Sequence, residues 1–289
     1  MARPALIVAG GAVFGLAALA IFVGEKRRPL RRSTQAELRR SIANAVLGAM
    51  SMAVIALVER PVTGALARQA EKRRRGIVQR LPAPAWARDA AAVLLMDYAT
   101  YWWHVATHRV PLLWRFHLVH HIDLDLDTTT ALRFHAVDMT LSTPVRAGQV
   151  ALIGASPRAL QLYQAWFFLS VWFHHSNLAL PEHWERRLAR VITTPRMHGI
   201  HHTASRDRTE SNWSSGFALW DHLHRSFRLD APHPDDAIGV PGYRDPAETG
   251  VAKALAMPFG RERDAWLTTA ATIAPALPAL GPTASAQAA

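Results

Sequence analysis

Histidine is unevenly distributed in this chain, and its spacing indicates metal chemistry. Twelve of the 15 histidines lie within residues 104–202, and eight of the twelve fall in three short motifs. Neutral imidazole is a good ligand for iron, zinc, copper and nickel, and a concentration of ligand side chains marks a candidate metal site. The three motifs are His104-x3-His108, His117-x2-His120-His121 and His198-x2-His201-His202.

The spacing within each motif predicts that its histidines converge. Residues three and four apart share one face of a helix, so each motif directs two or three imidazoles toward one point. Structural zinc closes with four ligands and catalytic zinc takes three and a water, so eight imidazoles indicate two metal ions. A nitrogen-rich pair of ions with open positions suits iron that binds dioxygen. The chain lacks the Glu-x-x-His motifs of soluble di-iron bundles.

The N-terminal part of the chain is apolar enough to enter a membrane. Residues 5–24 and 41–58 contain no charged side chain, and each segment is about long enough, as a helix, to cross a bilayer. A cleaved signal peptide is the alternative for the first segment. Its apolar run exceeds a usual signal core, however, and the stronger basic cluster, residues 26–32, follows it. We therefore expect a retained anchor.

Further apolar segments predict the helices that carry the histidines. Residues 90–103 form a third apolar segment, which leads into the first motif. Pro111 interrupts the helical pattern, and a new helix is expected over 114–121. Residues 139–155 and 159–173 are separated by a Ser-Pro turn signal, which predicts a hairpin between the histidine-rich regions.

The expected fold is an all-α integral membrane bundle of about four transmembrane helices or hairpins, with a cytoplasmic histidine-rich helical cap that holds a dimetal site. We divide the chain into a membrane anchor region with basic loops (1–85), a catalytic domain (86–228) and a polar, proline-containing segment with a low-complexity tail (229–289). Basic stretches flank residues 41–58 on both sides, so charge does not fix the orientation. The cytoplasmic face of a bacterial inner membrane is expected because reducing partners are found there.

Composition excludes several other chemistries. Cysteine is absent, which excludes disulfides, cysteine-ligated iron–sulfur clusters and thiolate nucleophiles, so electrons must come from a partner. The net charge of +11 and the isoelectric point near 11.1 are compatible with anionic lipid, because the basic residues concentrate around the apolar segments. No nucleic-acid-binding motif is present, and we expect no nucleic-acid partner.

The chain resembles the fatty acid hydroxylase and sterol desaturase superfamily of membrane non-haem di-iron oxygenases over roughly residues 90–228. Segments 97–108, 114–121 and 194–202 are similar to the three histidine boxes of that family, and segments 133–135, 175–178 and 220–221 are similar to auxiliary motifs. Departures from the family pattern are expected to affect substrate fit more than metal binding. They are Ala136, Val137 and Asp138 in place of Pro and Glu, Asn212-Trp213-Ser214 in place of Asn-Tyr-Gly, and His222 and His224 after Trp220-Asp221.

Spacing and resemblance together indicate nine metal ligands: His104, His108, His117, His120, His121, His198, His201, His202 and, as the ninth, His175. Three other histidines fit a ligand or an ordinary structural role equally: His135, His174 and His183. Asp97 precedes His104 by two helical turns, so it is expected to orient a ligand imidazole through the second ring nitrogen. Asn177 and Asp221 are expected behind the ligands as well, with turn or cap roles as the alternative.

The resemblance implies two iron ions (zinc is possible as purified), dioxygen as co-substrate, and an external ferredoxin, cytochrome or flavoprotein reductase as electron donor. The reaction would be hydroxylation or desaturation of a C–H bond of a lipid, with fatty acyl, sterol, carotenoid and ether lipids all compatible. The aromatic side chains of residues 166–173 fit either a lipid route or core packing.

Two other functions use histidine-bound metal in membranes, a metal transporter and a zinc hydrolase. A histidine-lined divalent metal transporter would place its ligands near the bilayer midplane, whereas the HxxHH motifs lie in polar sequence. A membrane zinc hydrolase would need a general base such as the Glu of HExxH, which is absent here.

Overall fold

The computed structural model describes residues 4–230, 237–261 and 263–267. β structure among these residues is limited to three isolated bridges, so the all-α class is confirmed. The α-helices are α1 (Pro4–Arg27), α2 (Glu37–Val54), α3 (Arg60–Arg73), α4 (Ala85–Arg109), α5 (Pro111–His121), α6 (Ala136–Ile153), α7 (Pro157–His175), α8 (Glu182–Leu188), α9 (Pro195–His201), α10 (Arg206–Thr209), α11 (Leu219–His224) and α12 (Val251–Ala256). A π-helix, η1 (Ile55–Glu59), joins α2 to α3, and 3-10 turns cover η2 (Val78–Arg80), η3 (Thr130–Leu132), η4 (Pro246–Thr249) and η5 (Met257–Phe259).

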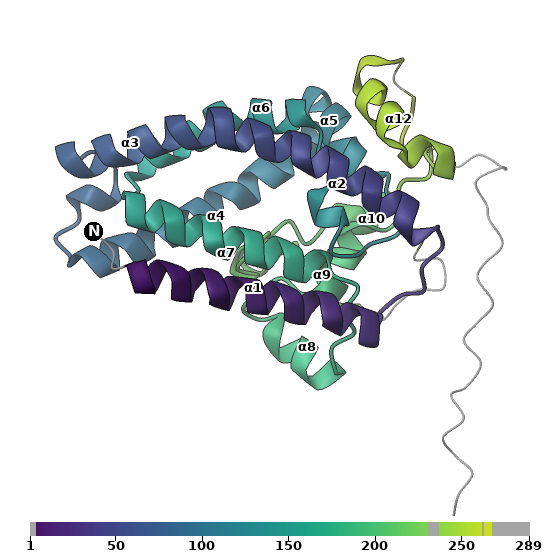
Figure 1. Cartoon of the computed structure of the whole chain (residues 1–289), viewed down its shortest axis with the longest axis horizontal. Helices are drawn as coiled ribbons and strands as arrows, with labels where there is room; N and C mark the ends of the chain where they lie inside the picture. The colour runs from purple at the N-terminus through teal and green to yellow at the C-terminus, as the bar shows by residue number, and fades with distance from the viewer. Residues whose placement is uncertain (1–3, 231–236, 262, 268–289) are drawn as a thin grey trace, which may run out of the picture.

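The long helices form one elongated bundle. Helices α1, α2–α3, α4, α6 and α7 run along the long axis, and the short helices α9, α10 and α12 lie toward the end of the bundle away from α3 (Figure 1). Helix α4 packs on α7 and α5, and α3 packs on α6. The main apolar core lies where these helices meet, around Met96, Val150, Leu160 and Tyr163.

One helix in the described part of the chain, Glu37–Arg80, is long and apolar enough to cross a membrane. Its first half carries exposed apolar side chains at every fourth position, namely Leu38, Ile42, Val46 and Met50. Such a stripe is unusual on a water-exposed surface and suits contact with lipid. Residues 5–24 are helical as part of α1. The number of membrane spans stays a prediction.

The predicted hairpin between the histidine-rich regions is confirmed. Helices α6 and α7 are joined by residues 154–156, and the Ser156 hydroxyl accepts a hydrogen bond from the Ala159 N–H at 3.0 Å, which caps α7. The helix break at Pro111 is also confirmed, because α4 ends at Arg109 and α5 begins at the proline. The hairpin brings the last residues of α7 back to the end of the molecule where α5 lies.

The loop after α5 is a polar connection, as expected, but it is buried. Arg40 of α2 pairs with Asp123 at 2.8 Å and also with Asp127. Asp125 accepts backbone N–H groups from Thr34 and Gln35, both at 2.9 Å. These ion pairs and hydrogen bonds offset the cost of burying the charges. They also fix the start of α2 against the end of α5.

The described C-terminal residues pack on the same end of the bundle. Val240, Tyr243 and Ala265 share an apolar cluster with Leu118 and Ile122. The division of the chain at residue 228 stays a prediction. Most of the expected low-complexity tail, from residue 268 on, lies outside the described residues.

Two glycines allow the α6–α7 turn to cross the chain after α3. Gly154 and Gly76 have φ of +80° and +91°. A Cβ on Gly154 would lie 2.4 Å from the Arg75 carbonyl oxygen. Only glycine adopts the positive φ and leaves room for the neighbouring backbone without strain.

We expect Gly154→Ala to destabilise the protein by at least about 1–2 kcal/mol, since alanine is strained in the left-handed region and would also clash. Thermal denaturation in detergent would measure the loss. Gly148→Ala is the control, because a Cβ there meets nothing within 4 Å in mid-helix and removes a helix-breaking glycine. Equal melting temperatures for the two variants would contradict the close crossing.

Candidate metal centre

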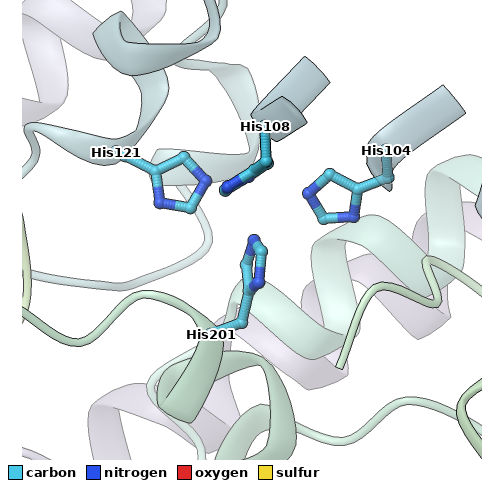
Figure 2. A group of neighbouring side chains, drawn as sticks. All are labelled: His104, His108, His121 and His201. Atoms are coloured by element: carbon cyan, nitrogen blue, oxygen red, sulfur yellow. The ribbon is translucent and has the colours of Figure 1, made fainter. Parts of the chain in front are cut away.

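Four histidines from three helices form cluster 1. His104 and His108 come from α4, His121 from α5 and His201 from α9. One ring nitrogen from each lies within 4.8 Å of the corresponding nitrogens of the other three. Figure 2 shows the four rings pointing toward a common centre. This arrangement can hold a metal ion.

Four more histidines form cluster 2: His120, His175, His198 and His202, all buried. The Nε2 atom of His175 lies 3.1 Å from that of His120 and 3.0 Å from that of His198, which is 3.0 Å from that of His202. Two imidazole nitrogens that bind the same ion, each at about 2.1 Å, can lie up to about 4.2 Å apart. The separations therefore fit a shared ion.

The two clusters share their supporting helices through the adjacent histidine pairs. His120 belongs to cluster 2 and His121 to cluster 1, whereas His201 belongs to cluster 1 and His202 to cluster 2. Consecutive helical residues point about 100° apart, so one HxxHH motif supplies both clusters. The rings of His121 and His202 stack with centroids 4.3 Å apart, which places the clusters side by side.

Hydrogen bonds fix which nitrogen faces each centre. In cluster 1, Nδ1 of His104 donates to the Trp213 carbonyl at 2.7 Å, and Nδ1 of His201 donates to the Ser211 carbonyl at 2.9 Å. The Nε2 atoms of His108, His121 and His201 are buried and have no hydrogen-bond partner. A carbonyl on the far nitrogen leaves the near lone pair free for a metal, so this donor set fits metal binding.

The loop over residues 211–214 supplies those carbonyls. Asn212 has a left-handed backbone with φ of +52°, and its side-chain amide donates to the Met197 carbonyl at 2.8 Å. The Asp221 carboxylate accepts the N–H groups of Trp213 and Ser214 at 2.8 and 3.0 Å. Asp221 thus acts on the backbone behind cluster 1. The backbone of residues 211 and 213 supports two histidines, and the expected effect of the departures at 212–214 on substrate fit stays a prediction.

His117, the remaining predicted ligand, lies between the clusters. Its ring centroid is 5.0 Å from that of His121 and 5.3 Å from that of His120, and its Nε2 is buried without a partner. Its Nδ1 lies 3.4 Å from the carboxylate of buried Asp138. The structure therefore brings all nine predicted ligands together, eight of them in the two clusters.

Two expected supporting residues are placed elsewhere. Asp97 was expected to orient an imidazole, but its carboxylate accepts from the Trp166 indole at 3.0 Å and the Trp220 indole at 2.7 Å. A carboxylate inside the bundle satisfies its charge through these donors. Asn177 exchanges hydrogen bonds of 2.8 Å with the backbone of Arg31, so it holds the α1–α2 connection and takes the alternative turn role.

The three remaining candidates differ in position. His135 caps α6 by accepting the Val137 N–H at 3.1 Å, and His183 is exposed on α8. His174 lies against cluster 2, with its ring centroid 4.1 Å from that of His198, although it belongs to neither group of four.

A cavity of about 440 Å³ extends from the histidines into the bundle. Its wall includes histidines from both clusters and apolar side chains such as Phe134, Phe167, Phe168 and Trp172. The aromatic side chains of α7 therefore have two roles. Trp166 donates a hydrogen bond to Asp97, whereas its neighbours line the cavity. Sequence reasoning missed Glu59 and Arg146 on the same wall, although an acid directly after an uncharged run was a visible signal.

Comparison with known proteins agrees with this geometry. Residues 90–226 match the family model described as fatty acid hydroxylase. This part of the chain belongs to the fatty acid hydroxylase family. The matched segment contains all nine predicted ligands.

Three curated relatives are distant. Alkylglycerol monooxygenase from Homo sapiens is 26% identical over 145 residues, which cover 48% of this chain and 30% of the relative. Ornithine lipid hydroxylase OlsE from Rhizobium tropici is 27% identical over 172 residues, 59% of this chain and 50% of the relative. Very-long-chain aldehyde decarbonylase GL1-5 from Oryza sativa subsp. indica is 26% identical over 159 residues, 50% of this chain and 25% of the relative. The matched part of this chain thus spans half or less of these relatives. No solved structure matches.

Burial of the histidines predicts acid sensitivity of the metal-free protein. Burial lowers the pKa of His201 from 6.5 to about 3, against the opposing effect of the Ser211 carbonyl, and lowers the pKa of His121 and His202 well below the usual value. Between these pH values the unfolded chain binds protons that the folded chain does not. The contribution of these histidines to the free energy of unfolding is therefore fully present above pH 6.5, and it falls as the pH decreases toward 3.

The expected result is a lower melting temperature for chelator-stripped protein at about pH 4 than at about pH 7, measured in detergent. His183→Ala should show the same pH dependence as the unmodified chain, since His183 is exposed. A melting temperature that is unchanged or higher in acid would contradict burial of neutral imidazoles.

Proposed function

We propose that this protein is a membrane-bound di-iron oxygenase that hydroxylates or desaturates a C–H bond of a lipid, with dioxygen and electrons from an external donor. The observation that carries the proposal is the position of the two histidine clusters at the wall of a mainly apolar cavity. Family membership of residues 90–226 supports the same activity. The relatives named above, a monooxygenase and a hydroxylase of lipids among them, support a lipid substrate.

The residues that would hold the ions are the four histidines of cluster 1, the four of cluster 2 and His117 between them. When bound, an iron pair supplies the redox chemistry by which dioxygen oxidises an unactivated C–H bond. The all-nitrogen donor set also accepts zinc, so zinc in purified protein is compatible with the proposal.

The chain's own residues prepare the site for this chemistry. The carbonyls of Ser211 and Trp213 hold two imidazoles with Nε2 directed at cluster 1. Asp138 holds Nδ1 of His117 in the same way from 3.4 Å, which orients that ring toward the clusters. The cavity walls bind a hydrocarbon chain and exclude water from its reacting carbon.

The cavity also bears on the alternatives. A divalent metal transporter needs a polar pathway to its ligands, and a zinc hydrolase needs access for water and a general base. Aromatic side chains such as Phe134, Phe167 and Phe168 line the wall beside the histidines, which suits a hydrocarbon better than a hydrated ion. The structure favours neither alternative by a specific observation.

We propose a cytoplasmic site in an integral membrane protein of the bacterial inner membrane, with ferredoxin, a cytochrome or a flavoprotein reductase as donor. The membrane-length helix Glu37–Arg80 supports the membrane location. Supplying purified chain with iron, dioxygen and a reductant should convert a lipid to a product that gains one oxygen atom or loses two hydrogens. Mass spectrometry of extracted lipids measures this, and the absence of oxidation across fatty acyl, sterol, carotenoid and ether lipids would overturn the activity.

Metal content tests the ligand assignment independently of substrate. His201→Ala removes a ligand from cluster 1 and His120→Ala removes one from cluster 2, so each variant should lose about one of two ions, and both should lose oxidation activity. Elemental analysis of detergent-purified protein expressed with ample iron is the measurement. The control His183→Ala should keep both ions. Full metal content in both ligand variants would rule out the assignment.

A further inference from the structure

A buried ion pair lies on the cavity wall away from the histidines. Glu59, the last residue of the π-helix η1, and Arg146 of α6 both line the cavity. Arg146 Nε and Glu59 Oε2 lie 3.3 Å apart, yet neither atom makes a hydrogen bond. Only 6% of Glu59 is exposed. An ion pair inside an apolar helical bundle is costly, so a functional role is the first hypothesis for it.

A hydroxyl group completes the polar end of the cavity. Tyr163 of α7 lines the same wall, hydrogen-bonds Thr100 of α4, and lies within hydrogen-bonding reach of the Arg146 guanidinium. Phe167 packs against Arg146, with the guanidinium carbon 5.2 Å from the ring centroid. A local widening of a helix into a π-turn, as in η1, is often found at functional sites.

The ion pair lies farther along the bundle than the histidines, whereas Tyr163 reaches Thr100, one helical turn before His104. Asp138, which contacts His117, and Arg146 are on the same helix; eight residues of α-helix correspond to about 12 Å. Next to Glu59, the exposed Arg60 also lines the cavity, so the cavity reaches the surface beside the ion pair. A molecule that enters there can place a polar group at the ion pair and an apolar chain toward the histidines.

We propose that Glu59, Arg146 and Tyr163 bind the polar group of the lipid substrate, and that this group is uncharged and both donates and accepts hydrogen bonds, as a hydroxyl does. The inference deepens the proposed function and rests on it. It also makes the distance from the polar group to the histidines a determinant of which carbon reacts.

The chemistry of the pair selects such a group. Glu59 Oε2 is an acceptor that lacks a donor, and Arg146 Nε is a donor that lacks an acceptor. A hydroxyl satisfies both, and the Tyr163 hydroxyl adds a third partner. A carboxylate offers no proton to Glu59 and is repelled by it, because like charges at close range in a low-dielectric cavity disfavour each other, and the Arg146 charge that would attract a carboxylate is already compensated by Glu59. A free fatty acid should therefore bind less well than the matching alcohol.

The test is equilibrium binding of a radiolabelled long-chain alcohol to the full chain in detergent, with competition by the fatty acid of the same chain length. The alcohol should bind about tenfold more tightly than the acid, the scale of one hydrogen bond to a charged group. In Glu59→Gln the repulsion disappears and the Arg146 charge is uncompensated, so the preference should reverse in favour of the acid.

The matched control is Asp89→Asn. Asp89 is a buried acid that accepts a hydrogen bond from Ser156 at 2.7 Å and lies 3.8 Å from the exposed Arg158, and the cavity wall does not include it. This variant should keep the alcohol preference. If Glu59→Gln is folded and also keeps it, the pair only links two helices and the proposal is overturned.

A second variant tests the proposal if Glu59→Gln does not fold. Tyr163→Phe removes only the hydroxyl and should weaken binding of the alcohol several-fold with no change for the acid. Unchanged alcohol binding in this variant would also overturn the proposal. Binding needs no turnover, so a chain that discriminates the two lipids but contains no metal would contradict the proposed oxygenase and leave this inference standing.

Discussion

The structure depends on one requirement: seven buried imidazoles and the half-buried imidazole of His108, all with converging lone pairs, must be satisfied together. A buried polar atom without a partner costs about 1–3 kcal/mol. In cluster 2, three neighbouring Nε2 pairs lie at 3.0–3.1 Å, and in cluster 1 three buried Nε2 atoms have no hydrogen-bond partner. A cation satisfies several such nitrogens at once. The two clusters are therefore arrangements that could hold metal ions.

The support behind the ligands is mostly backbone. Two carbonyls from the loop at 211–214 fix imidazoles of α4 and α9, and Asp221 in turn fixes the loop. Helix ends, rather than helix middles, provide most ligands, because α4, α5, α7 and α9 all finish at or just after their histidines. Short capped helices such as α9, with Thr194 as N-cap and Pro195 following, thus determine the geometry.

Local sequence predicted what local forces decide. The break at Pro111, the α6–α7 hairpin and the convergence within each motif follow from helical periodicity and from proline. Long-range partners could not be predicted in this way. Asp97 shares a face with His104, yet two indoles from α7 and α11 take its carboxylate. The acidic run after α5 gave no sign that Arg40, more than eighty residues earlier, would be buried against it. The number of membrane spans, the ligand roles and the domain division stay predictions, because no contact within the protein decides them.

The adjacent histidine pairs have a mechanical consequence. A single peptide unit in α5, and another at the end of α9, joins a histidine of one cluster to a histidine of the other. The peptide unit is planar, so a backbone displacement at either pair moves both of its imidazoles together. A shift of the backbone at one cluster therefore reaches the second. The two clusters therefore rest on one shared backbone, and neither can be displaced as a separate unit.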